Sequence, residues 1–283
     1  MTKVVYIAGT VHSGTTLLGM CLASTAVAIH FGEVFNILDK KLERNLKQYC
    51  TTGVLAKDCD FWAPTLKKLD SLGENCSTQD KYHVFLTSVE EHFGSEVTII
   101  DSSKDPKHIQ TLVDVVGADN LTIIHLTKDV RSYAESMEQK RKRSINWKKT
   151  KMFFFGFGLE EHFIKWYKVN KRIEKAIELS GVKKTIILTY EFLCLRSHEV
   201  ANLINSAHGE LIIDLDKSPR RSRDYTITGN RMRENPKKLA AINYDFRWFE
   251  STRWIRPFLL FPKIRRYNES IYRKLSSGDI FKN

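Results

Sequence analysis

The chain has 283 residues, of which 42% are hydrophobic and 28% are charged, the composition of a soluble globular protein. Its formal net charge of +12 favours anionic partners such as nucleotides, nucleic acid or a membrane surface, without choosing among them. The apolar stretch at 257–262 is far too short to cross a bilayer, and a strand is predicted within the first few residues. We therefore expect a cytoplasmic protein without an N-terminal signal or anchor.

The first stretch with a clear pattern is KVVYIAGTVHSGTT, residues 3–16. Its apolar, β-branched run at 4–7 predicts a buried strand that Gly9 ends. A turn of small residues follows and leads into an apolar helical pattern from Leu17 onward. A strand, a small-residue loop and a helix N-terminus together aim backbone N–H groups and the positive end of the helix dipole at one point. The pattern therefore predicts a phosphate site.

The spacing of this loop is close to that of a nucleotide-triphosphate P-loop. Gly9 and Gly14 are correctly spaced, but Thr15 stands where such a loop needs lysine. Without the lysine the loop lacks its reach to the β- and γ-phosphates, whereas Ser13, Thr15 and Thr16 still offer hydroxyls and amides to a single phosphate. The loop suits a terminal 5′-phosphate better than ATP. An ordinary strand-to-helix turn that binds nothing is the alternative.

Runs of apolar, β-branched residues alternate with helical patterns along most of the chain. They predict further strands at 28–35, 97–100, 121–126 and 185–188. They also predict helices at 40–49, 82–93, 106–116 and 163–177, and one that begins after Asp129 and continues to residue 140. This alternation implies an α/β fold with a central parallel sheet flanked by helices. Ligands of such sheets collect at the carboxyl ends of the strands, where Glu33, Lys104 and Lys128 fall. The sequence has no internal repeat or low-complexity linker, so one domain over residues 1–283 is expected.

A strongly basic stretch, residues 140–151, contains one tryptophan. It is either a solvated helix end and loop, or a segment that covers an anionic ligand or contacts nucleic acid or acidic lipid. The sequence alone does not choose between these roles.

Two of these segments resemble motifs of one enzyme family. Residues 9–16 resemble the 5′-phosphosulfate loop of sulfotransferases that use 3′-phosphoadenosine 5′-phosphosulfate (PAPS). Residues 126–131 together with Ser136 resemble the family's 3′-phosphate motif, in which a basic residue, here Lys128, is followed eight positions later by serine. Two separated motifs in the expected order are much more specific than either alone. The resemblance covers residues 3–275 and implies the P-loop-like sulfotransferase fold.

Three further stretches agree with the family. Residues 101–106 are similar to a segment of bacterial sulfotransferases and to the Lys-Asp-Pro element of tyrosylprotein sulfotransferases. Residues 189–193 resemble the Tyr-Glu-Asp-Leu stretch after a core strand, and residues 228–233 the late Gly-Asn-x-x-Arg segment that closes over the cofactor. The resemblance implies that PAPS is bound by His12, Ser13, Gly14, Thr15, Thr16, Lys128, Ser136, Tyr190, Gly229, Asn230, Arg231 and Arg233.

Two positions depart from the family pattern. His12 stands where the loop usually has Arg or Lys, and Lys128 stands where the 3′-phosphate motif usually has Arg. Lys128 still offers a positive charge, but as a point charge without the planar fork of arginine. His12, with an ordinary pKa of about 6.5, donates a hydrogen bond when neutral and supplies charge when protonated.

The resemblance also implies a mechanism. Sulfuryl transfer is similar to phosphoryl transfer, with in-line attack on a tetrahedral centre, so catalysis consists mainly of positioning and electrostatic stabilisation. Glu33 matches a glutamate on the strand after the loop in tyrosylprotein and glycan-type relatives, and we expect it to be the general base. Lys104 matches the family lysine near the bridging oxygen and is expected to stabilise the leaving group, with His12 as its helper. If His12 is instead the base, Glu33 orients it.

Both catalytic assignments have structural alternatives. Glu33 could pair with a nearby Lys or Arg, and Lys104 could be a solvated lysine at a helix start. No metal is expected, because the acidic and serine ligands that hold Mg²⁺ in P-loop enzymes are not evident. A zinc site is not expected either, since Cys50, Cys59 and Cys76 form no Cys-x-x-Cys pair.

Two other classes of function stay open. A P-loop small-molecule kinase or NTPase would need the loop lysine that is missing. A non-enzymatic basic module would bind nucleic acid or membrane through 140–151 and the Arg-rich C-terminal region. We expect PAPS as the donor, a small-molecule, natural-product or glycan-type acceptor, no nucleic-acid partner and no stable membrane insertion. The acceptor pocket is expected within 36–94 and 140–160, while the acceptor's identity, O- or N-sulfation and the oligomeric state are not encoded in any motif.

Overall fold

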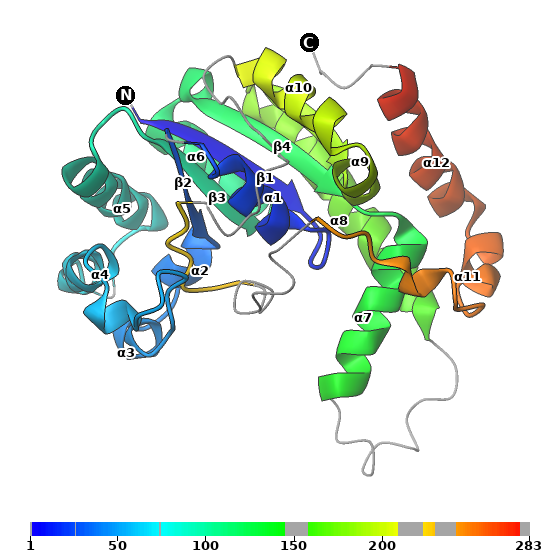
Figure 1. Cartoon of the computed structure of the whole chain (residues 1–283), viewed down its shortest axis with the longest axis horizontal. Helices are drawn as coiled ribbons and strands as arrows, with labels where there is room; N and C mark the ends of the chain where they lie inside the picture. Colours follow the sequence, from blue (N-terminus) through cyan, green and yellow to red (C-terminus); the bar gives the residue numbers. More distant parts are fainter. Residues whose placement is uncertain are drawn as a thin grey trace.

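The fold is built on one parallel β-sheet (Figure 1). A computed structural model of the chain describes residues 2–25, 27–73, 75–144, 158–208, 223–229 and 242–277. Within these residues the sheet consists of β1 (Lys3–Gly9), β2 (Ala28–Gly32), β3 (Thr98–Lys104), β4 (Leu121–Thr127) and β5 (Thr185–Thr189). The strand order is β2-β3-β1-β4-β5, and every neighbouring pair is parallel. The predicted α/β fold with a central parallel sheet is confirmed.

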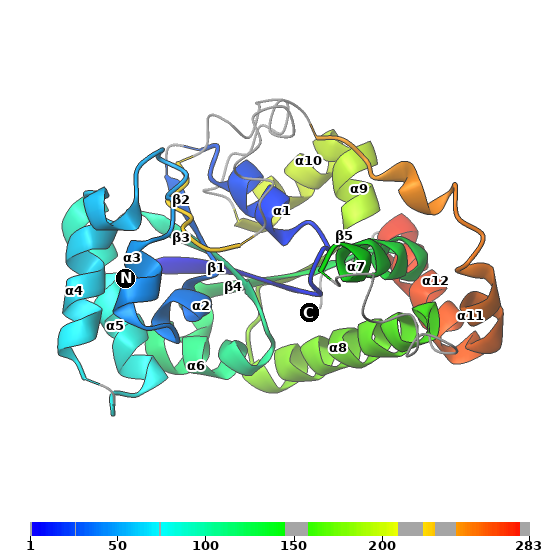
Figure 2. The same cartoon turned by 90° about the horizontal axis from the view of Figure 1, so that it is seen from below.

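Helices cover both faces of the sheet (Figure 2). The described helices are α1 (Thr15–Leu22), α2 (Val34–Leu38), α3 (Leu42–Leu46), α4 (Trp62–Ser71), α5 (Thr78–Phe93), α6 (Lys107–Val116), α7 (Val130–Ser144), α8 (Leu159–Ser180), α9 (Tyr190–Leu195), α10 (Ser197–His208), α11 (Ile255–Leu260) and α12 (Pro262–Ser277). Helices α1, α9 and α10 pack on one face, and α5, α6 and α8 on the other. The central strand β1 contributes side chains to the apolar clusters on both faces of the sheet. Val4 and Tyr6 belong to one cluster, and Val5 and Ile7 to the other.

A third apolar cluster joins α7 and α8 to the C-terminal helices. It contains Tyr133 of α7, Trp166 of α8 and Ile264 of α12. Buried Asn268 of α12 accepts a hydrogen bond from the N–H of Val130 at 2.9 Å, which fixes the beginning of α7. No helix in the described ranges is both long and apolar enough to span a membrane.

The carboxyl ends of four strands meet at one edge of the sheet. Ala8 of β1 pairs with Lys104 of β3, and Gly9 pairs with Leu126 of β4. The backbones approach closely here, since a Cβ on Gly9 would lie 2.5 Å from the Leu126 carbonyl oxygen. Thr127 of β4 in turn pairs with the last residue of β5. This register places the loops after β1, β3, β4 and β5 at the same edge, where ligands of parallel sheets bind.

The chain leaves β2 earlier than the sequence predicts. The expected strand up to residue 35 is wrong, because β2 ends at Gly32 and α2 begins at Val34. Gly32 has a φ of 73°, a conformation that favours glycine and turns the chain away from the sheet. The N–H of Phe35 then donates to the hydroxyl of Ser103 at 3.1 Å. The helix predicted over 40–49 is also shorter, since α3 has only five residues.

A short segment, residues 223–229, runs beside β2 and forms backbone hydrogen bonds with His30. The His30 ring lies between two side chains, with Nε2 3.0 Å from Ser102 Oγ and Nδ1 3.2 Å from Asp224 Oδ1. His30 and Ser102 have no exposed surface. This Ser-His-Asp arrangement therefore holds the segment in place instead of acting on a substrate, and it brings Gly229 to the carboxyl edge of the sheet.

Candidate active site

The loop between β1 and α1 closes tightly on itself. The N–H and the hydroxyl of Ser13 both donate to the carbonyl of Thr10, at 3.2 and 2.7 Å. Ser13 is fully buried, so its hydroxyl proton is committed to the loop. The hydroxyl oxygen of Thr10 is buried without a hydrogen-bond partner.

Gly14 completes the turn into α1. It has a φ of 91°, and a Cβ there would lie 2.7 Å from the ring of Tyr190, so both backbone and space require glycine. Thr15 and Thr16 then begin the helix and are buried. The first N–H groups of a helix have no carbonyl partner within it, so the turn directs them at the carboxyl edge of the sheet.

His12 is the unusual residue of this loop. It is one of two non-glycine residues with positive φ in the described part of the chain, at 64°, and its Nε2 is buried without a hydrogen-bond partner. Burial, together with the charges of Lys140, Lys128, Lys104 and Arg247, lowers the pKa of His12 to about 4. The imidazole is therefore neutral at neutral pH. Of the neutral and protonated forms of His12 considered from the sequence, the free protein contains the neutral one.

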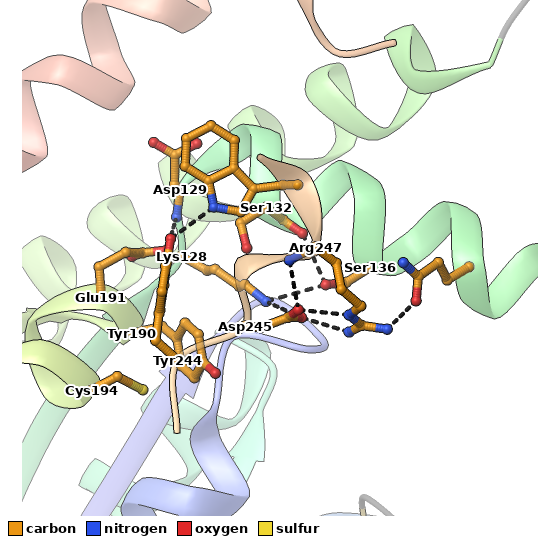
Figure 3. Close-up of polar contacts among 12 residues, drawn as sticks. Lys128, Asp129, Ser132, Ser136, Tyr190, Glu191, Cys194, Tyr244, Asp245 and Arg247 are labelled. Atoms are coloured by element: carbon orange, nitrogen blue, oxygen red, sulfur yellow. Dashed lines mark hydrogen bonds and ion pairs between the residues drawn. The ribbon is translucent and has the colours of Figure 1, made fainter. Parts of the chain in front are cut away.

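Lys128 and Ser136 lie together (Figure 3). Lys128 follows β4 and Ser136 lies on α7, and Lys128 Nζ donates to Ser136 Oγ at 3.1 Å. The ammonium group also lies 4.6 Å from the centre of the Tyr190 ring. Lys128 is only 3% exposed. Burial lowers its pKa, and the carboxylates of Asp245 and Glu191 oppose this effect.

Asp245 and Arg247 complete this cluster and were not found from the sequence. Asp245 directly precedes the 3₁₀ helix η5 (Phe246–Trp248), and Arg247 lies within it. Arg247 donates from Nε and Nη2 to the two oxygens of Asp245, at 2.6 and 2.5 Å, and Asp245 Oδ2 lies 3.6 Å from Lys128 Nζ. Burial raises the pKa of Asp245, but Arg247 and Lys128 outweigh it and bring the value to about 2. The carboxylate is therefore ionised at neutral pH.

Glu33 and Lys104 form a second cluster at the same edge. Lys104 Nζ donates to Glu33 Oε1 in an ion pair, and the other oxygen of Glu33 accepts from Asn36. Lys104 is the second residue with positive φ, at 74°. A Cβ on Gly229 would lie 3.8 Å from both Glu33 Oε1 and Thr16 Oγ1, so Glu33 lies beside the beginning of α1.

Buried Asp101 supports this second cluster. It accepts hydrogen bonds from the N–H of Ser103 at 2.9 Å and from the hydroxyl of Tyr82 at 3.2 Å. Burial raises the pKa of Asp101 to about 6, although these hydrogen bonds oppose the shift. Because Ser103 also binds the N–H of Phe35, this network ties the end of β3 to the beginning of α2.

A second buried network fixes the backbone after Lys128. The N–H of Asp129 donates to Glu191 at 3.1 Å, and Tyr272 donates to the other Glu191 oxygen at 2.7 Å. Asp129 also holds the guanidinium of Arg131 with two contacts of 2.8 Å. Burial and the charge of Asp129 raise the pKa of Glu191 to about 7. These hydrogen bonds hold the backbone that directly follows Lys128 and thereby position this lysine.

Some predicted site residues lie outside the described ranges. Asn230, Arg231 and Arg233 are among them, as are residues 145–151 of the basic stretch; the first part of that stretch ends α7. Among the residues that the structure does describe, no three or more His, Cys, Asp or Glu side chains are grouped to hold a metal ion.

Two solved structures of sulfotransferase domains match the architecture. One is the sulfotransferase domain from the curacin biosynthetic pathway, with a TM-score of 0.55, 17% identity and coverage of 89% of this chain and 87% of that domain. This chain has the sulfotransferase fold. The other is the domain from the olefin synthase of Synechococcus PCC 7002, with a TM-score of 0.55, 17% identity and coverage of 88% of each chain. No protein-family model and no curated protein matches the sequence.

In this sulfotransferase fold four of the predicted residues that the structure describes form two clusters at one edge of the sheet. The first contains Lys128 and Ser136, and the second contains Glu33 and Lys104. His12 is close enough to Lys104 and Lys128 for both charges to lower its pKa. The arrangement offers cations, hydroxyls and helix N–H groups to an anion, and a carboxylate able to accept a proton.

Proposed function

We propose that this chain transfers the sulfuryl group of PAPS to a hydroxyl or amine of a small-molecule, natural-product or glycan-type acceptor. The observation that supports it most is the buried, unpartnered Nε2 of His12, in a loop close to the charges of Lys104, Lys128, Lys140 and Arg247. Buried polar atoms normally have partners. An unpaired one that feels the charge of four cations and lies next to a helix N-terminus suits an anionic ligand.

The residues present fit a nucleotide with phosphates at two positions. The loop at 10–14 and the first turn of α1 would hold the 5′ end, where Thr10 and His12 have unpaired buried atoms. Lys128 and Ser136 would hold the 3′-phosphate, with one charged donor and one hydroxyl. Contacts from Asn230, Arg231 and Arg233 remain predictions. PAPS, when bound, supplies the sulfuryl group and the phosphate oxygen that leaves.

Glu33 is the proposed base. A carboxylate oxygen of Glu33 takes the proton of the acceptor hydroxyl or amine as the acceptor attacks. Protonation of Glu33 removes the negative charge that neutralises Lys104 in the free protein. The Lys104 ammonium then stabilises the negative charge that develops on the leaving oxygen, while neutral His12 contributes a hydrogen bond. One proton moves from the acceptor to Glu33, so charge and protons balance.

Thermal unfolding with nucleotides tests the proposal. The purified protein is measured with 3′-phosphoadenosine 5′-phosphate (PAP), with ADP plus Mg²⁺, and without ligand. A ligand at one hundred times its Kd stabilises by about 2.7 kcal/mol, which shifts the midpoint by several degrees at this chain length. We expect PAP to raise the midpoint without metal. An effect of ADP with Mg²⁺ to which the 3′-phosphate adds nothing would instead indicate a kinase.

The binding test needs a variant and a nucleic-acid control. Lys128→Ala is expected to show a smaller shift with PAP than the unaltered protein, each shift being taken from the midpoint of the same protein without ligand. Duplex DNA that binds with steep salt dependence, in a protein that ignores PAP, would favour the basic-module alternative.

A further inference from the structure

The cations of the first cluster already hold an anion that belongs to the chain. Figure 3 shows the Asp245 carboxylate between Arg247 and Lys128, with the contacts converging on its oxygens. Lys128 Nζ lies 3.6 Å from Asp245 Oδ2 and 3.1 Å from the Ser136 hydroxyl. The carboxylate therefore lies beside the lysine and serine that the proposed function assigns to the 3′-phosphate.

Carboxylates and phosphates suit the same donors. The fork of an arginine binds either group with two parallel hydrogen bonds, and a lysine binds either as a point charge. Arg247 makes two such contacts with Asp245, at 2.6 and 2.5 Å. Lys128 is 3% exposed, and a buried ammonium group without an anion would be costly. Asp245 thus supplies the countercharge that this lysine needs in the free protein.

Asp245 lies on a segment whose tip faces solvent. The Asp245 side chain is 20% exposed, and its neighbours Phe246 and Phe249 are 59% and 63% exposed. The segment is anchored one residue beyond Arg247, where the Trp248 ring stacks 4.2 Å from the Arg131 guanidinium. A rotation of the Asp245 side chain toward solvent therefore breaks its ion pairs and the hydrogen bond that it accepts from the Arg247 N–H at 3.3 Å, but it requires no rearrangement of the core.

We propose that Asp245 is an internal substitute for the 3′-phosphate, which the nucleotide displaces when it binds. The inference rests on the proposed function. Binding exchanges one anion for another on Lys128 and Arg247, so neither cation is left without an anion at any stage. Return of Asp245 then assists release of the product nucleotide, PAP. Asp245 therefore determines how strongly the protein binds a 3′-phosphate, without touching the 5′ end.

Calorimetric titration of Asp245→Asn with PAP and with ADP tests this inference. The asparagine keeps the size and one acceptor oxygen but removes the charge. We expect PAP to bind about tenfold more tightly than to the unaltered protein, and ADP, which lacks the 3′-phosphate, to bind unchanged. Glu199→Gln is the matched control, because it removes a carboxylate from an exposed ion pair with Arg196 on the same protein. It should alter neither affinity.

The possible outcomes separate the two proposals. Weaker PAP binding by Asp245→Asn would show that Asp245 only positions Arg247, and equal tightening of PAP and ADP would show a general charge effect; either result overturns the inference while leaving the sulfotransferase proposal intact. Absence of PAP binding by the unaltered protein would overturn the proposed function itself. A crystal structure of the unaltered protein with PAP decides the matter without a variant. Asp245 should have left Lys128, and its retention there would contradict the inference.

Discussion

Glu33 and Lys104 stand 71 positions apart in the sequence and form an ion pair at the carboxyl ends of β2 and β3. Their side chains are 15% and 14% exposed, so the pair is partly shielded from solvent but still accessible. The pairing is compatible with both interpretations of the sequence, a structural ion pair and a catalytic base with its cation. Kinetics distinguish them, because only the catalytic role separates turnover from nucleotide binding.

Replacing Glu33 by glutamine is expected to abolish most turnover while leaving PAP affinity unchanged. Loss of a positioned general base lowers the rate by about 10²–10⁴-fold, whereas Glu33 is not one of the proposed phosphate ligands. Turnover is measured with PAPS and an accepted substrate, and the PAP Kd by calorimetry. Glu43→Gln, at an exposed position of α3, should change neither value. An equal fall of PAP affinity in Glu33→Gln would contradict the base assignment.

Lys128→Ala and Ser136→Ala are expected to weaken PAP binding. A hydrogen bond to a charged group contributes about 1.5–3 kcal/mol, which corresponds to a loss of roughly 10- to 100-fold for either change. The ADP Kd should stay constant, because ADP has no 3′-phosphate. Ser206→Ala provides a control, since Ser206 donates to a carbonyl one turn earlier on α10, as Ser136 does on α7. Similar losses for PAP and ADP would refute the 3′-phosphate assignment.

The sheet could be predicted because its strands are buried on both faces. Residues 4–8 form a continuous apolar segment, Leu121–Thr127 is buried throughout, and the helical patterns between such runs imply parallel pairing. The end of β2 could not be predicted in the same way. Val34 and Phe35 have the composition of a strand, and only the positive φ of Gly32 turns them into a helix.

The candidate site, like the sheet, could be predicted from the sequence only in part. Lys128 and Ser136 were paired through the family resemblance, and the structure brings them into contact because the end of β4 and the adjoining helix α7 fix their separation locally. Asp245 and Arg247 could not be predicted, because they come from a segment without apolar periodicity. Arg247 contacts Gln139, 108 positions earlier. The only signal was an acidic and a basic residue two positions apart, which is too common to indicate a site.

The lowered pKa of His12 gives an expected pH dependence. His12 titrates near 4 in the folded protein and at about 6.5 when unfolded, so between these values the unfolded chain binds more protons. Its contribution to stability is complete above about pH 6.5 and is lost as the pH falls toward 4. Thermal midpoints of the unaltered protein should therefore fall more steeply on acidification than those of His12→Asn. Bound PAP should reduce this difference, because phosphates favour the protonated imidazole; parallel curves would contradict it.

Replacing His12 by glycine is expected to separate stability from binding. A non-glycine residue with a φ of 64° costs of order 1–3 kcal/mol when the surrounding structure forces it into a sparsely populated conformation, and glycine adopts it freely. His12→Gly should therefore unfold at the same or a higher temperature while its PAP Kd rises. Val11→Gly, at the exposed neighbouring position without positive φ, should lower the midpoint because the unfolded chain gains entropy.

If His12→Gly instead lowered stability as Val11→Gly does, with PAP binding intact, His12 would be a structural loop residue. Such a result would remove the main support for an anion site at this loop, since the unpaired nitrogen would then serve no ligand.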